Sequence, residues 1–200
     1  MRRFLQNVSI RMAVITALVF FTVALMSNVA VFTLSGQATQ RTLNTLELIN
    51  VKQLNAINRA DALLSGARVS LEVAVANFTN GQRDQALEYL RDAAERVELS
   101  ATRFEQFAAV PRTEQEEALG ARVESTFTAV MDTVQQQLEA LNQSDTFTFR
   151  LLRDELASLS SVQKETLTEF VRYAGQRGEA LQQELDDINR FYSLIEWGIL

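Results

Sequence analysis

Apolar and polar stretches of very different length alternate along this chain. A first apolar stretch, Met12–Leu34, holds no charged residue over 23 positions. As a helix it would extend about 34 Å, enough to cross the roughly 30 Å hydrocarbon core of a bilayer. A second apolar stretch covers Phe191–Leu200. The pattern predicts a transmembrane helix at 12–34 and the start of another at 191–200, with a polar segment at 35–190 between them.

Turn signals divide the polar segment into four helical lengths. The clearest are Asn80-Gly81, Val110-Pro111 and the run 142–145. Ala, Leu, Glu, Gln and Arg, which favour helices, dominate between them. The predicted helices are residues 36–79, 83–109, 113–142 and 147–190. Because short connections make successive helices antiparallel, the predicted fold class is all-α: an antiparallel up-down-up-down four-helix bundle continuous with two transmembrane helices.

Residue spacing adds detail to these helices. Thr113 followed by Glu116 is the pattern of a capping box at the start of the third helix. In the first and last helices, apolar residues recur every seven positions, which is the a/d seam of helices that face partner helices. The seam of the first helix consists of Asn50, Ile57, Leu64, Leu71 and Phe78, interleaved with Leu54, Asp61, Arg68 and Val75. The seam of the last runs unbroken from Leu167 to Ile195, so both helices are predicted to continue into the apolar stretches.

Charge predicts the orientation in the membrane. Arg2, Arg3 and Arg11 precede the first apolar stretch, and no acidic residue appears before Glu47. Positive charge on this side predicts a cytoplasmic N-terminus at residues 1–11 and places the polar segment outside the cytoplasm. In a bacterium this arrangement would be a multi-pass protein of the inner membrane with its polar segment, as a domain, in the periplasm. A cleaved secretory signal is the alternative, although its apolar region is usually only about 7–15 residues long.

Composition excludes several functions. Cysteine and histidine are absent from all 200 residues, so disulfides, thiol or imidazole catalysis and ordinary zinc sites are excluded. After residue 35, 16 basic residues stand against 25 acidic ones, which argues against a nucleic-acid partner. No phosphate loop or hydrolase motif is present. We predict no enzymatic activity, no catalytic residues, no metal site and no cofactor.

Arg68 is a charged residue in a seam where apolar residues are expected. It occupies an a/d position seven residues after Asp61, in a row that is otherwise largely apolar. A charge in such a seam is costly unless it is paired, hydrogen-bonded or hydrated. Two interpretations stay open. Arg68 and Asp61 fix the helix register, paired across a dimer interface, or the planar fork of Arg68 binds a ligand carboxylate.

The whole arrangement resembles a known family. A first crossing runs into a long helix, an acidic four-helix segment follows, and the last helix re-enters the membrane through Arg190-Phe191. This is similar to the sensor half of a bacterial methyl-accepting chemotaxis protein of the aspartate/serine-receptor type. The run 67–71, Ala-Arg-Val-Ser-Leu, is similar to the Arg-Ile-Asn-Leu segment in which those receptors place a ligand-binding arginine.

The resemblance implies a homodimer that binds a small ligand between its two first helices. Two further arginines of the family correspond here to Val73 and Asn77, so those positive groups are missing. At the start of the fourth helix, side chains are expected to complete the site: Thr148, Arg150 and Arg153 as polar contacts and Phe149 as an apolar wall. The expected ligand is an organic acid or an amino acid. A chemotaxis kinase and its adaptor are the partners implied for a cytoplasmic part beyond residue 200.

The predicted function is that of a transmembrane chemoreceptor. It senses a small, anionic periplasmic ligand and transmits the signal across the lipid bilayer, since ligand binding favours one helix arrangement over another. Two alternatives stay open: the periplasmic sensor of a histidine kinase, and a membrane-anchored helical binding protein that does not signal.

Overall fold

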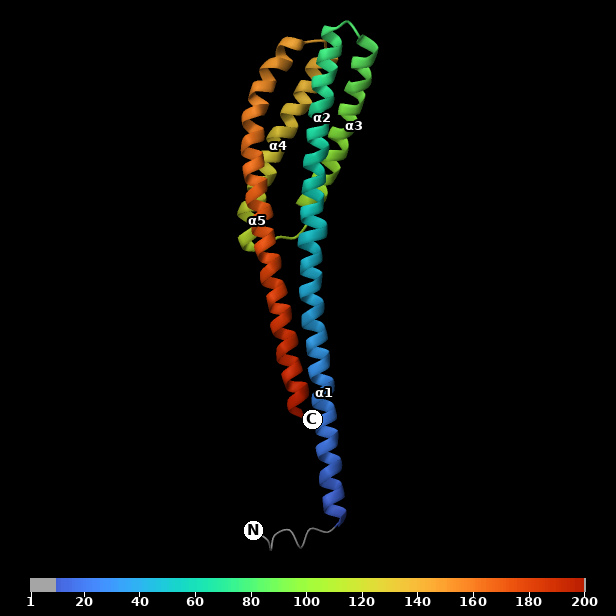
Figure 1. The fold of residues 1–200 in the computed structure, drawn as a ribbon, viewed down its shortest axis with the longest axis vertical. Helices are drawn as coiled ribbons and strands as arrows, with labels where there is room; N and C mark the ends of the chain where they lie inside the picture. Colours follow the sequence, from blue (N-terminus) through green and yellow to red (C-terminus); the bar gives the residue numbers. More distant parts are fainter. Residues whose placement is uncertain (1–9, 200) are drawn as a thin grey trace. The chain divides into compact units, whose positions relative to one another are not determined.

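The computed structural model describes residues 10–199, with side chains described at 12–49, 52–114 and 116–194. It consists of helices joined by short turns, and this part of the chain contains no strand. The elements are α1 Ile10–Glu47, the π-helical segment η1 Leu48–Leu54, α2 Asn55–Thr79, α3 Arg83–Ala108, α4 Glu114–Asn142 and α5 Thr146–Ile199 (Figure 1). The chain divides into two compact units. One unit consists of the residues up to Thr45 together with those from Glu179 onwards, and the other unit is Leu46–Gly178.

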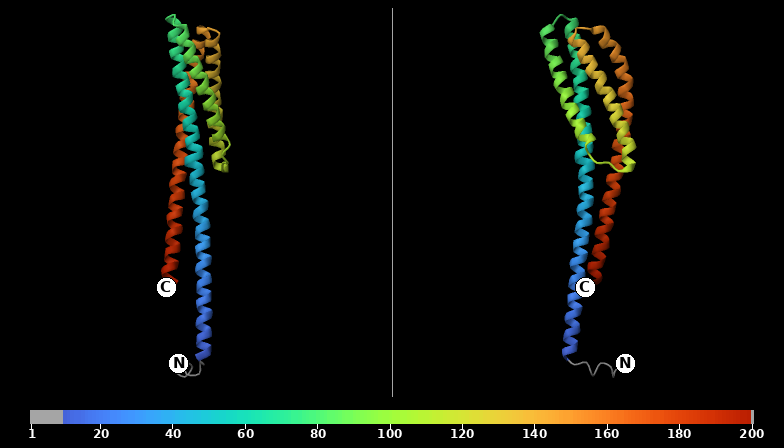
Figure 2. Two further views of the ribbon diagram at one scale, coloured as in Figure 1. Left: turned by 90° about the vertical axis from the view of Figure 1, so that its right-hand side faces the viewer. Right: turned by 180° about the vertical axis from the view of Figure 1, so that it is seen from behind.

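The unit Leu46–Gly178 is a bundle of α2, α3, α4 and the first part of α5. The α2–α3 and α4–α5 connections lie at one end of the bundle and the α3–α4 connection at the other (Figure 1, Figure 2). Successive helices are therefore antiparallel, and the predicted up-down-up-down four-helix bundle is confirmed. At all three turns the helix ends lie within one residue of their predicted places.

Backbone conformation at the turns explains where the helices end. Gly81 (φ 76°) and Ser144 (φ 62°) adopt the left-handed conformation that terminates a helix. The remaining connection, between α3 and α4, contains Pro111. There the Thr113 backbone N–H donates to Glu116 Oε2 at 2.9 Å, and the Thr113 hydroxyl donates to the same oxygen at 3.1 Å. The predicted capping box is thus confirmed.

We expect Gly81→Ala to lower the free energy of unfolding by about 1 kcal/mol, because a Cβ is disfavoured at positive φ. Nothing lies within 4 Å of the added Cβ, so the loss would report the backbone alone. Gly81→Asn is the control, since asparagine tolerates this conformation better than alanine. Denaturation followed by circular dichroism measures both variants. Equal losses for the two would contradict this explanation.

Small side chains form the contact between α2 and α3. The buried residues recur every seven positions on each helix: Ala60, Ala67 and Ala74 on α2, and Ala86, Ala93 and Ser100 on α3. The Ser100 hydroxyl donates to the backbone carbonyl of Ala60 at 2.8 Å. Side-chain size at a helix contact sets the distance between the axes, so this seam lets the two helices pack closely.

Phenylalanines fill the part of the core where α3, α4 and α5 meet. Phe104 stacks on Phe127 with ring centroids 4.5 Å apart, and Phe107 meets Phe170 edge-on at 5.3 Å. Offset and edge-to-face aromatic pairs stabilise a core beyond the area they bury. These rings join α3, α4 and α5 in the apolar core of the bundle.

Charged side chains hold the start of α4 against α5. Glu116 is 2% exposed and forms an ion pair with Arg177. Burial acts to raise the pKa of the Glu116 carboxyl, but hydrogen bonds from Thr113 and Arg177 outweigh it and hold the pKa below its ordinary value of 4.5. Nearby, the buried guanidinium of Arg112 pairs with Glu124 and lies 4.9 Å from the ring centroid of Phe107. This cluster therefore ties the α3–α4 connection and α5 to α4.

The other unit contains the apolar part of α1. The continuous helix from Met12 to Thr79 is long and apolar enough to cross a membrane, and none of its most apolar window is buried. Phe20 and Phe32 are 73% and 77% exposed. The predicted cytoplasmic N-terminus at residues 1–11 and the last residues of the predicted crossing at 191–200 fall largely outside the described side chains. The sequence did not predict η1, where the helix changes to π-type hydrogen bonding without ending.

Candidate functional site

The polar residues of the α2 seam lie on the side of α2 that faces α5. Ile57, Leu64 and Leu71 are buried in the bundle, whereas Asp61 and Arg68 are half-buried. The Gln163 amide nitrogen donates to Asp61 Oδ1 at 3.2 Å, which links α5 to α2. Burial raises the pKa of the Asp61 carboxyl, and the positive charge of Arg68 opposes this only in part. In the described chain the hydrogen-bond partner of Asp61 is therefore Gln163, and no ion pair joins it to Arg68.

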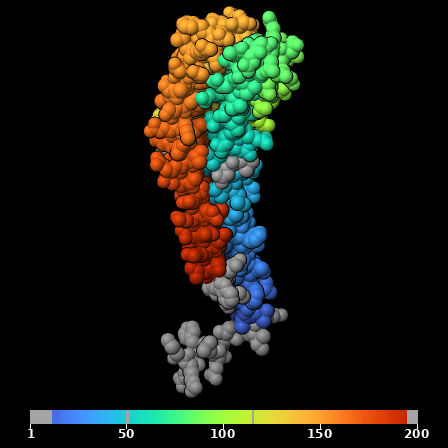
Figure 3. All heavy atoms as spheres, turned by 45° about the horizontal axis from the view of Figure 1, so that its top comes forward, coloured from blue at the N-terminus to red at the C-terminus, as the bar shows by residue number. Residues whose placement is uncertain are grey.

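Arg68 lines two adjoining hollows on the side of α2 that faces α5. On the face of the bundle drawn in Figure 3, the surfaces of α2 and α5 lie side by side. We name the two hollows by their charged residues. The Arg68–Arg153 groove has a volume of about 600 Å³, and α2, α4 and α5 contribute to it through Ser65, Arg68, Val69, Glu72, Val73, Ala76, Asn77, Gln137, Arg153 and Leu156. The Asp61–Arg172 groove, about 550 Å³, lies between α2 and α5 and adds Lys164 and Arg172 as positive charges.

Arg153 is the second cation of the Arg68–Arg153 groove. Its guanidinium lies 4.0 Å from a carboxylate oxygen of Glu72, and both side chains are about half exposed. Exposed ion pairs of this kind contribute only about 0–1 kcal/mol to stability. Replacing the contact of Arg153 with Glu72 by a contact with a ligand carboxylate therefore costs little free energy, so Arg153 remains available to a ligand. Two predicted site residues, Arg68 and Arg153, thus come together in one groove.

Gln137 of α4 also lines this groove, and the sequence analysis missed it. The residue is 2% exposed, and its amide nitrogen has no hydrogen-bond partner among the described residues. A buried donor without a partner is costly, so such groups call for a specific explanation. A signal was present in the sequence: Gln137 is a polar residue in the row of α4 whose other members are apolar and buried, namely Val123, Phe127, Val130, Val134 and Leu141.

The remaining predicted site residues lie elsewhere. Phe149 is 1% exposed and belongs to the hydrophobic core. The Thr148 backbone N–H and hydroxyl donate to the Asp145 carboxylate at 3.0 and 2.6 Å, which caps the start of α5 and lowers the pKa of Asp145. Arg150 is exposed and lines neither groove. The structure therefore does not bring these three side chains to Arg68.

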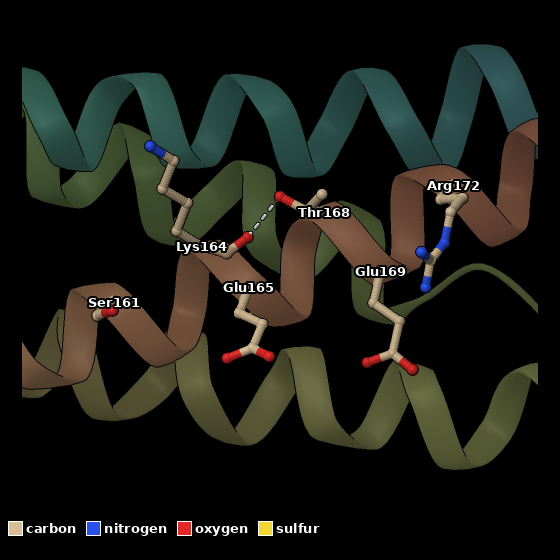
Figure 4. A pocket seen from close by; sticks show the side chains of 6 residues that line it. All are labelled: Ser161, Lys164, Glu165, Thr168, Glu169 and Arg172. Atoms are coloured by element: carbon tan, nitrogen blue, oxygen red, sulfur yellow. Dashed lines mark hydrogen bonds between the residues drawn. The ribbon is translucent and has the colours of Figure 1, made fainter.

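A further hollow of about 600 Å³ is lined by α5 alone (Figure 4). Lys164 points towards α2, whereas Glu165 and Glu169 point towards α4. Glu169 forms an ion pair with Arg122 at 3.0 Å. Because its charges are mixed and point in different directions, this hollow does not favour an ion of either sign.

Among the residues that the structure describes, no group of three acidic side chains is placed to hold a metal ion. What the Arg68–Arg153 groove offers is recognition: two guanidinium groups for carboxylates, one unpaired amide donor, and apolar contacts from Val69, Val73 and Leu156. Its volume lies within the roughly 300–1,000 Å³ typical of small-molecule sites.

A family model matches most of this chain. The family model described as "Tar ligand binding domain homologue" matches residues 4–167. This range includes the whole of α2, α3 and α4, the first part of α5, and all residues of the Arg68–Arg153 groove. No curated protein matches the chain.

Proposed function

Because the chain belongs to the family of Tar ligand-binding-domain homologues, which are chemotaxis sensor domains of the aspartate/serine-receptor type, we propose that it is a sensor. The proposed sensor binds a small anionic ligand outside the cytoplasm and transmits the signal across the membrane. Domains of this family bind small molecules and are in general not enzymes. The proposed chemistry is therefore binding alone, with no catalytic residue and no cofactor.

One observation carries the proposed ligand class. Arg68 and Arg153 line the same groove as the unpaired amide donor of Gln137. Guanidinium groups bind carboxylates through two parallel hydrogen bonds, and the amide supplies a third donor for the same or a second carboxylate. Glu72 lies beside Arg153, so a ligand ammonium group also has a partner. We propose an organic acid or an amino acid as the ligand.

We propose that two crossings anchor this domain. Residues 1–11 are the cytoplasmic N-terminus, 12–34 the first crossing, 35–190 the periplasmic domain and 191–200 the start of the second crossing. The exposed apolar surface of α1 supports the first crossing, because such a surface is stable in lipid and costly in water. The arginines before Met12 support the orientation.

We propose further that two copies pair through the outer side of α2. Val69 is 64% exposed there, and the small residues Ala62, Ser65 and Ala76 around it are exposed too. The Arg68–Arg153 groove opens beside this strip, since Val69 and Ser65 also line it. A partner copy would therefore cover the groove and exclude water from the ligand. A chemotaxis kinase and its adaptor are the proposed cytoplasmic partners.

A ligand screen tests this function. The chain in detergent micelles is melted in the presence of amino acids and of mono-, di- and tricarboxylic acids. A ligand at 100 times its dissociation constant stabilises the protein by about 2.7 kcal/mol, so a hit raises the melting temperature. No stabilisation by any of these compounds would contradict the proposal and favour a membrane-anchored protein that does not signal.

We expect Gln137→Leu to weaken binding of a screen hit about three- to thirtyfold while leaving the free protein as stable as before or more stable. The variant removes a donor that the ligand would satisfy, and it also removes an unpaired buried polar group. Isothermal titration and thermal melts measure the two effects. Gln135→Leu, at an exposed position on the same helix, is the control. Unchanged affinity in Gln137→Leu would remove Gln137 from the site.

A further inference from the structure

A second concentration of positive charge lies between α2 and α3. A groove of about 430 Å³ is lined by Arg59, Ala62 and Leu63 of α2 and by Arg96, Leu99 and Arg103 of α3. Three of these six side chains are guanidinium groups and none is a carboxylate. The chain as a whole carries a net charge of −6, so this local excess of positive charge runs against the composition of the protein.

Contacts hold Arg96 in place within this groove. Its Nε donates to Asp92 Oδ2 at 2.7 Å, and the Ser70 hydroxyl donates to the same oxygen at 2.5 Å. The hydrogen bond to Asp92 uses only Nε, so both terminal nitrogens of the guanidinium are left for another acceptor. These hydrogen bonds also lower the pKa of Asp92, which keeps it charged. Arg96 is therefore positioned before any ligand arrives.

Gly66 of α2 makes room for this arrangement. A Cβ at position 66 would come within 2.9 Å of Arg96 Nη1 and 3.4 Å of its Cδ. The absence of a side chain thus lets the guanidinium lie against the helix beside the groove. An alanine at position 66 would displace the tip of Arg96 without changing the charge of the protein.

The other lining residues suit an organic anion. Arg103 donates to the neutral side chain of Gln106 at 2.9 Å. No ion pair among the described residues involves Arg59 or Arg103, whereas Arg96 pairs with Asp92. Leu99 is 47% exposed, which offers an apolar contact to a carbon chain between the three cations. Guanidinium groups recognise carboxylates and phosphates bidentately, and the apolar contact favours the former on an organic scaffold.

This groove is separate from the Arg68–Arg153 groove. Arg59 and Arg68 are nine residues apart, which at about 3.6 residues per turn places them on opposite sides of α2. The two grooves share no lining residue. We propose that the α2–α3 groove is a second binding site, which takes a small organic anion with two or more carboxylates held by Arg59, Arg96 and Arg103.

Titration with citrate tests the second site. It uses the whole chain in uncharged detergent, in the background of Arg68→Ala so that the first groove does not contribute. We expect saturable binding at constant ionic strength. Arg96→Gln should weaken it at least about tenfold, because a charged hydrogen-bond donor is lost. Gly66→Ala should weaken it several-fold at unchanged net charge, because Arg96 must move.

Arg91→Gln is the matched control, since Arg91 is an exposed arginine of α3 outside the groove. Citrate binding in this variant should equal that of the background protein. Equal losses in Arg91→Gln and Arg96→Gln would show attraction to net charge alone and overturn the proposal. Absence of saturable binding, or unchanged affinity in both Arg96→Gln and Gly66→Ala, would also overturn it. Neither result would affect the proposed function, because the background lacks Arg68.

Discussion

Replacing Glu116 by alanine is expected to lower the free energy of unfolding by about 3 kcal/mol, the range found when one partner of a buried ion pair is removed. The Glu116 carboxylate accepts hydrogen bonds from the Thr113 backbone and hydroxyl and pairs with Arg177. Its loss leaves Arg177 without its partner and uncaps the start of α4. Chemical denaturation of the chain in detergent, followed by circular dichroism, measures the change.

Glu117→Ala is the matched control for this variant. Glu117 is the next residue, lies in the same first turn of α4 and is exposed. Its replacement removes the same charge near the same helix end, which costs about 0.3–1 kcal/mol. Similar losses for Glu116→Ala and Glu117→Ala would mean that the helix dipole, and not the buried pair, explains the effect.

Lowering the pH should also remove the stabilising contribution of the Glu116 carboxylate. The pKa of Glu116 is lower in the folded protein than its ordinary value of 4.5, so the folded state binds this proton less readily than the unfolded state. The contribution of Glu116 to stability is therefore complete above about pH 5 and is lost as the pH falls through the lowered pKa. Wild type should lose more stability than Glu116→Gln over this pH range.

Arg68→Ala is expected to weaken binding of a screen hit about ten- to a hundredfold and to abolish its thermal shift at concentrations that stabilise the wild type. Truncating a group that makes charged hydrogen bonds costs about 1.5–3 kcal/mol of binding free energy. Arg68 is half-buried at the surface of α2 and is outside the apolar core, so the helical content should not change. Titration calorimetry and circular dichroism measure these two quantities.

Two further variants separate charge from geometry at this position. Arg68→Lys keeps the positive charge but not the planar fork, so it should recover only part of the affinity. Arg91→Ala removes an exposed arginine of α3 and should leave affinity unchanged. A full thermal shift in Arg68→Ala would remove Arg68 from the site and favour the alternative that Arg68 and Asp61 only fix the helix register.

Local sequence determined the helices because their ends depend on local chemistry. Gly81 adopts the left-handed conformation that its neighbours require, Pro111 cannot continue a helix, and Thr113 and Glu116 cap each other. None of these effects needs a distant partner. Placing Arg68 in the largely apolar a/d row of the predicted helix 36–79 likewise follows from seven-residue spacing alone.

The rest of the site depends on contacts between residues far apart in the chain. Bringing Arg68, Gln137 and Arg153 to one groove requires the packing of three helices. The partner of Glu116 is 61 residues away, and that of Asp61 is 102 residues away. Phe149 and Thr148 were predicted to contact ligand from a family pattern at a helix start, where small differences in loop length decide which side chains point inwards. The roles of Thr148, Phe149 and Arg150 in binding stay predictions.

The alanine and serine seam between α2 and α3 has a mechanical consequence. Residues with almost no side-chain freedom interlock there at close range, and the hydroxyl of Ser100 is bonded to the neighbouring backbone. Sliding one helix past the other by a residue would bring larger side chains into a gap made for methyl groups. The α2–α3 helix pair is therefore expected to move as one rigid body. A movement within the bundle is more easily taken up along α5, where exposed ion pairs such as Arg153–Glu72 and Glu169–Arg122 can break and re-form beside the apolar contact of Phe170.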